Sequence, residues 1–129
     1  MHSQCLGGKF FKIAHGILEN KTELGLSDET FRKVKDLKIS TKKELIKANA
    51  EIEIAAVDIM ANMCESSADT TEINKLIDKK YTLKKESMKT LVSAFLNLKK
   101  MVTKEQMAKL HSMCKSHAGS EEKGKSCCS

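Results

Sequence analysis

The feature that most constrains the fold is an apolar repeat that runs unbroken from position 31 to position 63. Its members recur at steps of three or four: Phe31, Val34, Leu37, Thr41, Leu45, Ala48, Ile52, Ala55, Ile59 and Met63. This spacing matches one face of an α-helix, and no alternating strand pattern competes with it. At about 1.5 Å per residue, a helix over residues 28–64 would be about 55 Å long.

A second stripe of the same kind begins after a short polar break at residues 65–69. Lys84 interrupts this stripe, whose apolar members are Ile73, Ile77, Tyr81, Met88, Leu91, Phe95, Leu98 and Val102. Asp69, with Glu72 three residues later, has capping-box spacing and predicts a helix start after the break. A short connection between two long helices predicts an antiparallel hairpin.

Two shorter helices are expected beside the hairpin. The first covers residues 9–24 and ends at Gly25, after which Ser27 is a natural N-cap for the first long helix. Near the other end, Thr103 and Gln106 have the spacing of a capping box that starts a last short helix. The expected fold class is therefore all-α: a hooked antiparallel hairpin of four helices, two long and two short.

One helical domain is expected over residues 9–118, between a flexible segment at residues 1–8 and a disordered polar tail at residues 119–129. The sequence holds no Pro and only five aromatic residues, a composition that suits long helices packed by stripes. A hairpin this long has few other elements to cover its apolar faces. We therefore expect a homodimer that buries the remaining apolar surface.

Charge is segregated along the chain. Residues 31–47 carry seven basic and two acidic residues, residues 48–78 one basic and seven acidic, and residues 79–104 eight basic and one acidic. A turn near Ser67 would make the shaft of the hairpin basic and its tip acidic. The candidate basic face for clients is Arg32, Lys35, Lys38, Lys42, Lys43, Lys47 and Lys89.

Such a face has two interpretations. It either keeps the protein soluble or attracts acidic and unfolded clients by long-range steering. Nucleic acid is not an expected partner, because the chain has a single Arg, few aromatic residues and no DNA-binding motif. An enzyme is not expected either, since the sequence contains no phosphate-binding loop, H-E-x-x-H motif or nucleophile elbow. A purely structural dimerisation protein is a further alternative.

Two helix starts resemble the paired LTxxQ motifs of the Spy/CpxP family, which includes the metal-linked ZraP and CnrX-like proteins. The first motif is Leu26-Ser27-Asp28-Glu29-Thr30, and the second is Val102-Thr103-Lys104-Glu105-Gln106. Thr30 stands where the family has Gln, and Val102 where it has Leu. The motif residues of interest are Leu26, Ser27, Thr30, Val102, Thr103 and Gln106. The order of short, long, long and short helices is also similar.

The resemblance implies a cradle-shaped antiparallel dimer in the periplasm. It further implies ATP-independent chaperone activity on unfolded or misfolded envelope proteins, metal-responsive signalling, or both.

No residue run approaches the length of a membrane span, so no transmembrane segment is expected. Met1 to Gly8 is too short and mixed for a signal peptide. The residues alone are therefore compatible with a cytoplasmic chain or with one whose signal has been removed.

The candidate metal ligands are His111, Cys114 and His117. Steps of three place them along one side of the last helix, and imidazole and thiolate suit Zn²⁺ or copper. The alternative is that Cys114 packs in a core and that the histidines are surface residues.

The five cysteines show no disulfide framework, and Cys64 is expected to be a small buried hydrophobe. No cofactor is required by the sequence, and Zn²⁺ or copper is the one cofactor it suggests.

Overall fold

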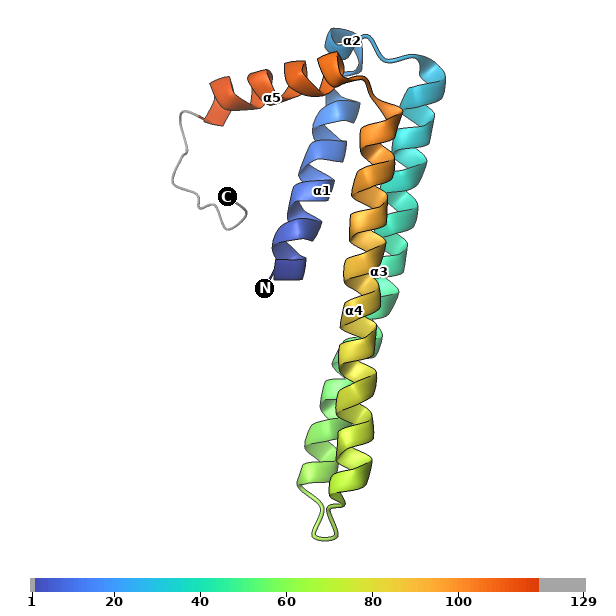
Figure 1. Ribbon diagram of the computed structural model, residues 1–129, viewed down its shortest axis with the longest axis vertical. Coiled ribbons are helices and arrows are strands. Elements are labelled where there is room, and N and C mark those ends of the chain that lie inside the picture. Colours follow the sequence, from blue (N-terminus) through green and yellow to red (C-terminus); the bar gives the residue numbers. More distant parts are fainter. Residues whose placement is uncertain (1, 119–129) are drawn as a thin grey trace. The chain divides into compact units, whose positions relative to one another are not determined.

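The computed structural model describes the backbone of residues 2–118 and the side chains of residues 6–113. Its helices are α1 (His2–Glu19), α2 (Lys21–Leu24), α3 (Asp28–Met63), α4 (Thr70–Met101) and α5 (Lys104–Ala118) (Figure 1). This part of the chain contains no strand, which confirms the all-α prediction. None of these helices has an apolar stretch long enough to cross a bilayer.

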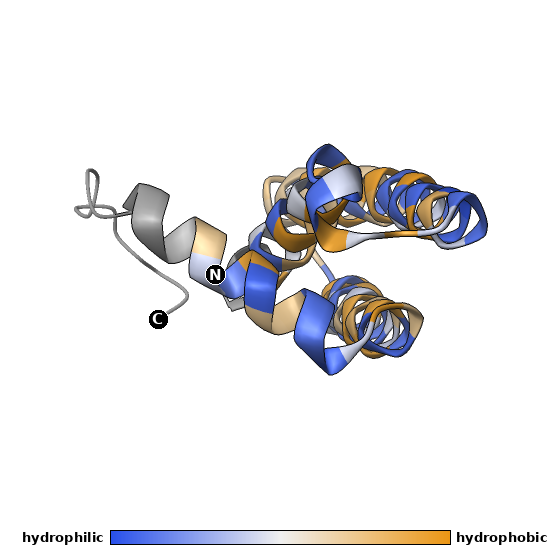
Figure 2. Ribbon diagram, turned by 90° about the horizontal axis from the view of Figure 1, so that it is seen from above, coloured by the Kyte–Doolittle hydropathy of each residue, from blue (hydrophilic) through white to orange (hydrophobic). Residues whose placement is uncertain are grey.

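The two long helices pack antiparallel, and both contribute to each of two compact units. Unit 1 combines α1, α2 and α5 with residues 28–41 of α3 and 91–101 of α4. Unit 2 contains residues 42–63 and 70–90 with the turn between them. The start of α3 and the end of α4 therefore share a unit, as a turn near Ser67 predicts. Apolar and polar residues alternate along both long helices (Figure 2).

Of the buried apolar side chains among the described residues, all but Ala55 belong to unit 1. Its largest fully buried side chains are Phe10 and Ile17 of α1, Val34 of α3 and Leu98 of α4. Helix α5 approaches α1 closely at Gly16, where an added Cβ would lie 3.1 Å from Leu110 Cδ1. A small residue at this position thus allows the two short helices to pack against each other.

The predicted first helix differs from the observed one in both its start and its continuity. Helix α1 already begins at His2, seven residues before the predicted start at residue 9. The helix is also interrupted at Asn20, which gives five helices in residues 2–118 instead of four. The Asn20 side chain donates to the Gly16 carbonyl at 2.8 Å, in parallel with its own backbone N–H. Such local bonding by Asn competes with helix continuation.

The predicted helix starts are confirmed for both long helices. Ser27 Oγ accepts from the Thr30 backbone N–H at 3.1 Å, just before α3 begins. Asp69 Oδ1 accepts from the Thr71 N–H at 3.1 Å before α4. Each cap satisfies one of the orphan N–H groups at the helix start. The Glu72 carboxylate forms an ion pair with the Lys75 ammonium at 4.0 Å.

Unit 2 is a helical hairpin whose packed face on α4 differs from the predicted stripe. Tyr81 was expected inside but is 56% exposed, and Ile77 is exposed as well. The predicted Ile73 and Met88 are half-buried, but so are Leu76 and Leu83, which the predicted stripe lacks, and Ser87 is buried. The Ser87 hydroxyl has no hydrogen-bond partner among the described residues. The two consecutive steps of four from Ile73 to Tyr81 drift around the helix by about 80°, which carries Tyr81 off the packed face.

Candidate functional site

The second cap motif joins α5 to α2 through Gln106. Thr103 Oγ1 accepts from the Gln106 N–H at 3.0 Å, and Gln106 Oε1 accepts from the Thr103 N–H at 2.9 Å. This is a complete capping box, as the sequence predicts. The Gln106 amide nitrogen also donates to the Leu24 carbonyl at 3.0 Å. One side chain therefore caps α5 and binds a segment 82 positions away.

All four backbone carbonyls of α2 accept a hydrogen bond. Leu26 N–H donates to the Lys21 carbonyl and Gly25 N–H to the Thr22 carbonyl, with Gly25 in the left-handed conformation at φ 70°. The remaining two carbonyls belong to Glu23 and Leu24. Lys109 Nζ donates to the first at 2.9 Å, and Gln106 donates to the second. So short a helix gains its stability from these tertiary partners rather than from its own length.

The first cap motif is simpler, because Thr30 replaces the longer Gln. Ser27 Oγ accepts from the Thr30 N–H and donates to Thr30 Oγ1, each at 3.1 Å. Within the described residues, Thr30 makes no bond to a distant helix comparable to that of Gln106. The apolar partners of the two motifs, Leu26 and Val102, are both buried. The six motif residues thus occupy two helix starts within unit 1.

Lys21 connects α2 to the start of α3. Its ammonium donates to Asp28 Oδ1 at 2.6 Å and lies 5.2 Å from the centre of the Phe31 ring. The hydrogen bond and the charge of Lys21 hold the pKa of the Asp28 carboxyl below its ordinary value of 3.8. Asp28 is the first residue of α3, where a negative charge also favours the helix dipole.

The candidate basic residues divide between the two units. Arg32, Lys35 and Lys38 belong to unit 1, where the first two are exposed and the third is half-buried. Lys42, Lys43 and Lys47 are exposed on α3 in unit 2. At about 100° per residue, five of the six lie on the half of α3 that faces away from its row of buried residues, whereas Lys38 lies beside that row, one turn from Val34 and Thr41.

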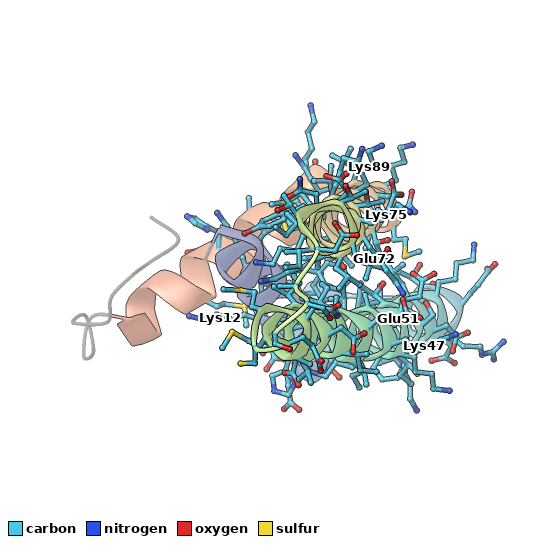
Figure 3. The ribbon with its side chains drawn as sticks, turned by 90° about the horizontal axis from the view of Figure 1, so that it is seen from below. Lys12, Lys47, Glu51, Glu72, Lys75 and Lys89 are labelled. Carbon is cyan, nitrogen blue, oxygen red and sulfur yellow. The ribbon has the colours of Figure 1, made fainter. Side chains whose placement is uncertain are left out.

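Lys89 does not join this group. It is exposed on α4 in unit 2, and Figure 3 shows it pointing away from Lys47 of α3. The two side chains therefore lie on opposite sides of the hairpin in unit 2. A single basic face that includes Lys89, as the sequence reasoning expected, is not formed within this unit.

A row of large apolar side chains is exposed on α3 in unit 2. Ile46, Ile54, Val57 and Met60 are each more than half exposed, and Val57 is 66% exposed. We call this row the α3 outer stripe, and it also includes the small residues Ala50, Ala61 and Cys64. Four of its members, Val57, Met60, Ala61 and Cys64, line an open, almost wholly apolar hollow together with the neighbouring Ala56.

The outer stripe lies opposite the packed face of the same helix. Ala55 is 2% exposed and marks the row of α3 that packs in the hairpin. Helix geometry places the centre of the outer stripe about 160° from that row. Helix α3 in unit 2 is therefore apolar on two opposite sides, of which the described chain covers one. Helices of this kind normally have a partner on both sides.

Sequence reasoning missed this stripe because it followed one row of the helix. The signal was present, since Ile46, Ala50, Ile54, Val57, Ala61 and Cys64 also recur at steps of three or four. Two residues at the end of this part of α3 also differ from what the sequence predicts. Cys64 is exposed rather than buried, and Met63 is 58% exposed rather than part of the packed row.

The candidate metal ligands fall partly outside the described side chains. His111 is exposed on α5, whereas Cys114 and His117 lie in α5 where the structure describes the backbone alone. Across the side chains of residues 6–113, no group of three or more His, Cys, Asp or Glu residues is arranged to hold a metal ion. The proposed site at residues 111, 114 and 117 thus stays a prediction from the sequence.

Comparisons with known proteins leave these surfaces to be interpreted from their own chemistry. No protein-family model, curated protein or solved structure matches this chain.

Proposed function

We propose that the chain is an ATP-independent chaperone that holds unfolded polypeptides on the α3 outer stripe of unit 2. The observation that carries this proposal is the row formed by Ile46, Ile54, Val57 and Met60, exposed on the side of α3 opposite its packed face. Soluble proteins rarely leave so continuous an apolar row uncovered unless it serves an interaction. The stripe therefore supports a binding role.

The chemistry of the stripe favours clients without a fixed shape. Apart from the exposed Glu53 on the same side of α3, it is a row of aliphatic side chains and one Met, with no convergent set of polar groups that would select a particular ligand. Flexible, polarizable Met side chains adapt to varied apolar partners. Lys42 and Lys43 lie on the same side of α3 near the start of the stripe. Their charge would attract acidic segments before apolar contact is made.

A second copy of the chain is the proposed resting occupant of the stripe. Basic residues Lys42, Lys43 and Lys47 precede Glu51, Glu53 and Asp58 along this part of α3. Two copies of α3 packed antiparallel would set the basic end of each against the acidic end of the other. Parallel packing would instead oppose like charges. We therefore propose an antiparallel homodimer whose interface competes with clients for the same side chains.

The resemblance to the Spy/CpxP family supports a role in envelope stress, with the periplasm as the proposed location. Both of its quoted motifs begin helices in the chain, at α3 and α5. Detection of the native protein in a periplasmic fraction, with a cytoplasmic marker absent, tests the location. Recovery with the cytoplasmic fraction would contradict it.

Suppression of client aggregation tests the function. Light scattering of a reduced, aggregating model client is followed with and without purified protein, in the absence of ATP. Wild-type protein at equimolar ratio should suppress the scattering. Val57→Asp should weaken suppression several-fold, because it places a charge in the stripe. Leu96→Asp is the matched control, since Leu96 is 50% exposed on α4 in unit 1.

Three outcomes decide between the alternatives. Suppression lost with Val57→Asp and kept with Leu96→Asp supports the proposal. Equal activity of both variants would reject the stripe as the binding surface. No suppression by the wild type at any ratio would reject the chaperone function, and a stable dimer by sedimentation would then favour a purely structural protein.

The metal-responsive alternative rests on the sequence alone. Calorimetric titration with Zn²⁺ and with Cu(I) tests it, using wild type and a His111→Ala, Cys114→Ser double variant. Binding by the wild type and its loss in the variant would support a site on α5. Equal binding by both proteins would remove that site, and binding by neither would remove the role.

A further inference from the structure

A cavity of about 570 Å³ opens in unit 1 between α1, the end of α4 and the first turns of α5. Its volume lies within the range of small-molecule sites. Its inner surface is mainly apolar and is formed by Ile13, Phe95, Val102, Met107, Ala108 and Leu110. Val102 and Leu110 are themselves buried, so the floor of the cavity is part of the core.

The rim of this cavity is cationic. Lys9, Lys99 and Lys104 line it together with His111 and Thr103, and its lining contains no carboxylate. All three lysines are exposed, and none of them forms an ion pair or side-chain hydrogen bond with another described residue. The helical segments that bring them together are α1, α4 and α5. Three ammonium groups from three helices thus surround one apolar floor.

Another hollow in the chain shows that this arrangement is not general. The cavity in unit 2 between α3 and α4 is lined by Lys47 but also by Glu44, Glu51 and Glu86. An anion would be repelled there by the three carboxylates. The unit 1 cavity combines a positive rim with an apolar interior, which is the complement of a molecule that has one anionic end and one hydrocarbon chain.

We propose that the unit 1 cavity binds a free aliphatic carboxylate, a medium-chain fatty-acid anion. The hydrocarbon chain lies on Phe95, Met107 and Leu110, where burial of its methylene groups is favourable. The carboxylate stays at the solvated rim among Lys9, Lys99 and Lys104. A charged end at the rim keeps its hydration, whereas a carboxylate deep in the cavity would lose it.

This site is independent of the proposed chaperone surface. The α3 outer stripe belongs to unit 2, and every residue that lines the fatty-acid cavity belongs to unit 1. Failure of either proposal therefore leaves the other standing. The two are separated by a direct comparison, because Val57→Asp should leave binding to the cavity unchanged.

Calorimetric titration of the full chain with decanoate, below its micellar concentration, tests the proposal. Decanol and decyltrimethylammonium serve as neutral and cationic ligands of equal chain length. Decanoate should bind with one molecule per chain and about tenfold more tightly than decanol. Decyltrimethylammonium should not bind detectably. Similar affinities for all three ligands would overturn the proposal, because the rim would then not discriminate between an anionic, a neutral and a cationic ligand.

Matched variants locate the binding. Lys99→Gln with Lys104→Gln removes two rim charges and should weaken decanoate binding about tenfold. Lys79→Gln with Lys100→Gln removes two exposed charges outside the cavity and should leave binding unchanged. Equal weakening by both pairs would reject a specific rim. All four positions are exposed, and circular dichroism verifies that each variant is folded.

A final pair of measurements separates a free carboxylate from a lipid headgroup. Met107→Glu places a carboxylate in the cavity and should abolish decanoate binding, because the ligand would meet both a like charge and a smaller space. Vesicles of phosphatidylglycerol are tested by flotation. Capture on vesicles without binding of decanoate would overturn the proposal in favour of a membrane-surface site.

Discussion

Gln106 shows how much one side chain contributes to the arrangement of the short helices. Its amide accepts from Thr103 at the start of α5 and donates to the last carbonyl of α2. Thr30, at the equivalent place of the first motif, bonds within its own turn. The two motifs therefore look alike in sequence but differ in reach, since Thr is too short to contact a second helix.

Truncation of Gln106 should destabilise unit 1. Gln106→Ala removes the capping box and leaves the Leu24 carbonyl without its donor, at an expected cost of about 1–2 kcal/mol. Urea denaturation followed by circular dichroism measures this loss. Thr103→Ala removes part of the same box, so the double variant should lose less than the sum of the single losses. Strict additivity would contradict a shared cap.

The Lys21–Asp28 pair predicts a pH-dependent stability difference. The folded-state pKa of Asp28 is lowered by Lys21, so its contribution is present above the ordinary value of 3.8 and is lost as the pH falls through the lower folded value. Asp28→Asn should therefore lower the melting temperature slightly at pH 7. The difference between the two proteins should shrink as the pH falls through the lowered folded-state pKa of Asp28, and it should also shrink in high salt. A difference that persists unchanged in acid would argue against the ion pair.

Helix α3 illustrates what the sequence can and cannot reveal about an element. Its start at Asp28, its length and its cap were predictable, because caps and periodicity are local signals. Its outer stripe was missed, because two apolar rows on one helix overlap in a simple count of steps. On α4, packing against α3 decides which row of side chains is buried, and the sequence of α4 by itself does not show this. The prediction that Tyr81 is packed was therefore wrong.

The site was less predictable than the fold for a related reason. Lys89 and Lys47 both occur in basic segments, but a sequence count gives no direction to a side chain on either helix. The unit 1 cavity depends on residues from α1, α4 and α5 that are far apart in the chain. No local pattern marks such a site. The break at Asn20 was also unexpected, since it follows from one side-chain bond to the Gly16 carbonyl.

Two glycines should respond to substitution in opposite directions. Gly25 ends α2 with φ 70°, so Gly25→Ala places a Cβ in the left-handed region at a cost of about 1 kcal/mol. Gly8 lies within α1, and a Cβ there would meet no atom within 4 Å. Gly8→Ala should stabilise the helix by up to about 1 kcal/mol. Thermal melting of both variants measures the two effects, and a stabilising Gly25→Ala would contradict the cap.

For the whole molecule, we propose that a second copy and a client share one face of unit 2. Exposed apolar groups supply the contact, while the lysines near the start of the outer stripe supply attraction at a distance. Salt should therefore affect the attraction at a distance and the apolar contact differently. Screening weakens interactions between exposed charges beyond about 8 Å at physiological ionic strength, but it does not weaken apolar contact.

Replacement of three lysines of α3 near the start of the outer stripe should slow client capture rather than abolish it. Lys42→Gln, Lys43→Gln and Lys47→Gln together should reduce the association rate with an acidic unfolded client several-fold, and the difference should diminish at high salt. Stopped-flow fluorescence of a labelled client measures the rate. Lys79→Gln, Lys85→Gln and Lys100→Gln form the charge-matched control. Equal slowing by both sets would assign the effect to net charge alone.

The outer stripe can be observed by NMR while a client binds. Methionine methyl groups labelled with ¹³C are followed by NMR, with the Met60 signal assigned through Met60→Leu. Addition of a permanently unfolded client should shift or broaden the signal of Met60, which is 59% exposed on the stripe, and leave that of half-buried Met88 nearly unchanged. A shift confined to Met107, or no shift at Met60 under saturating client, would contradict the account.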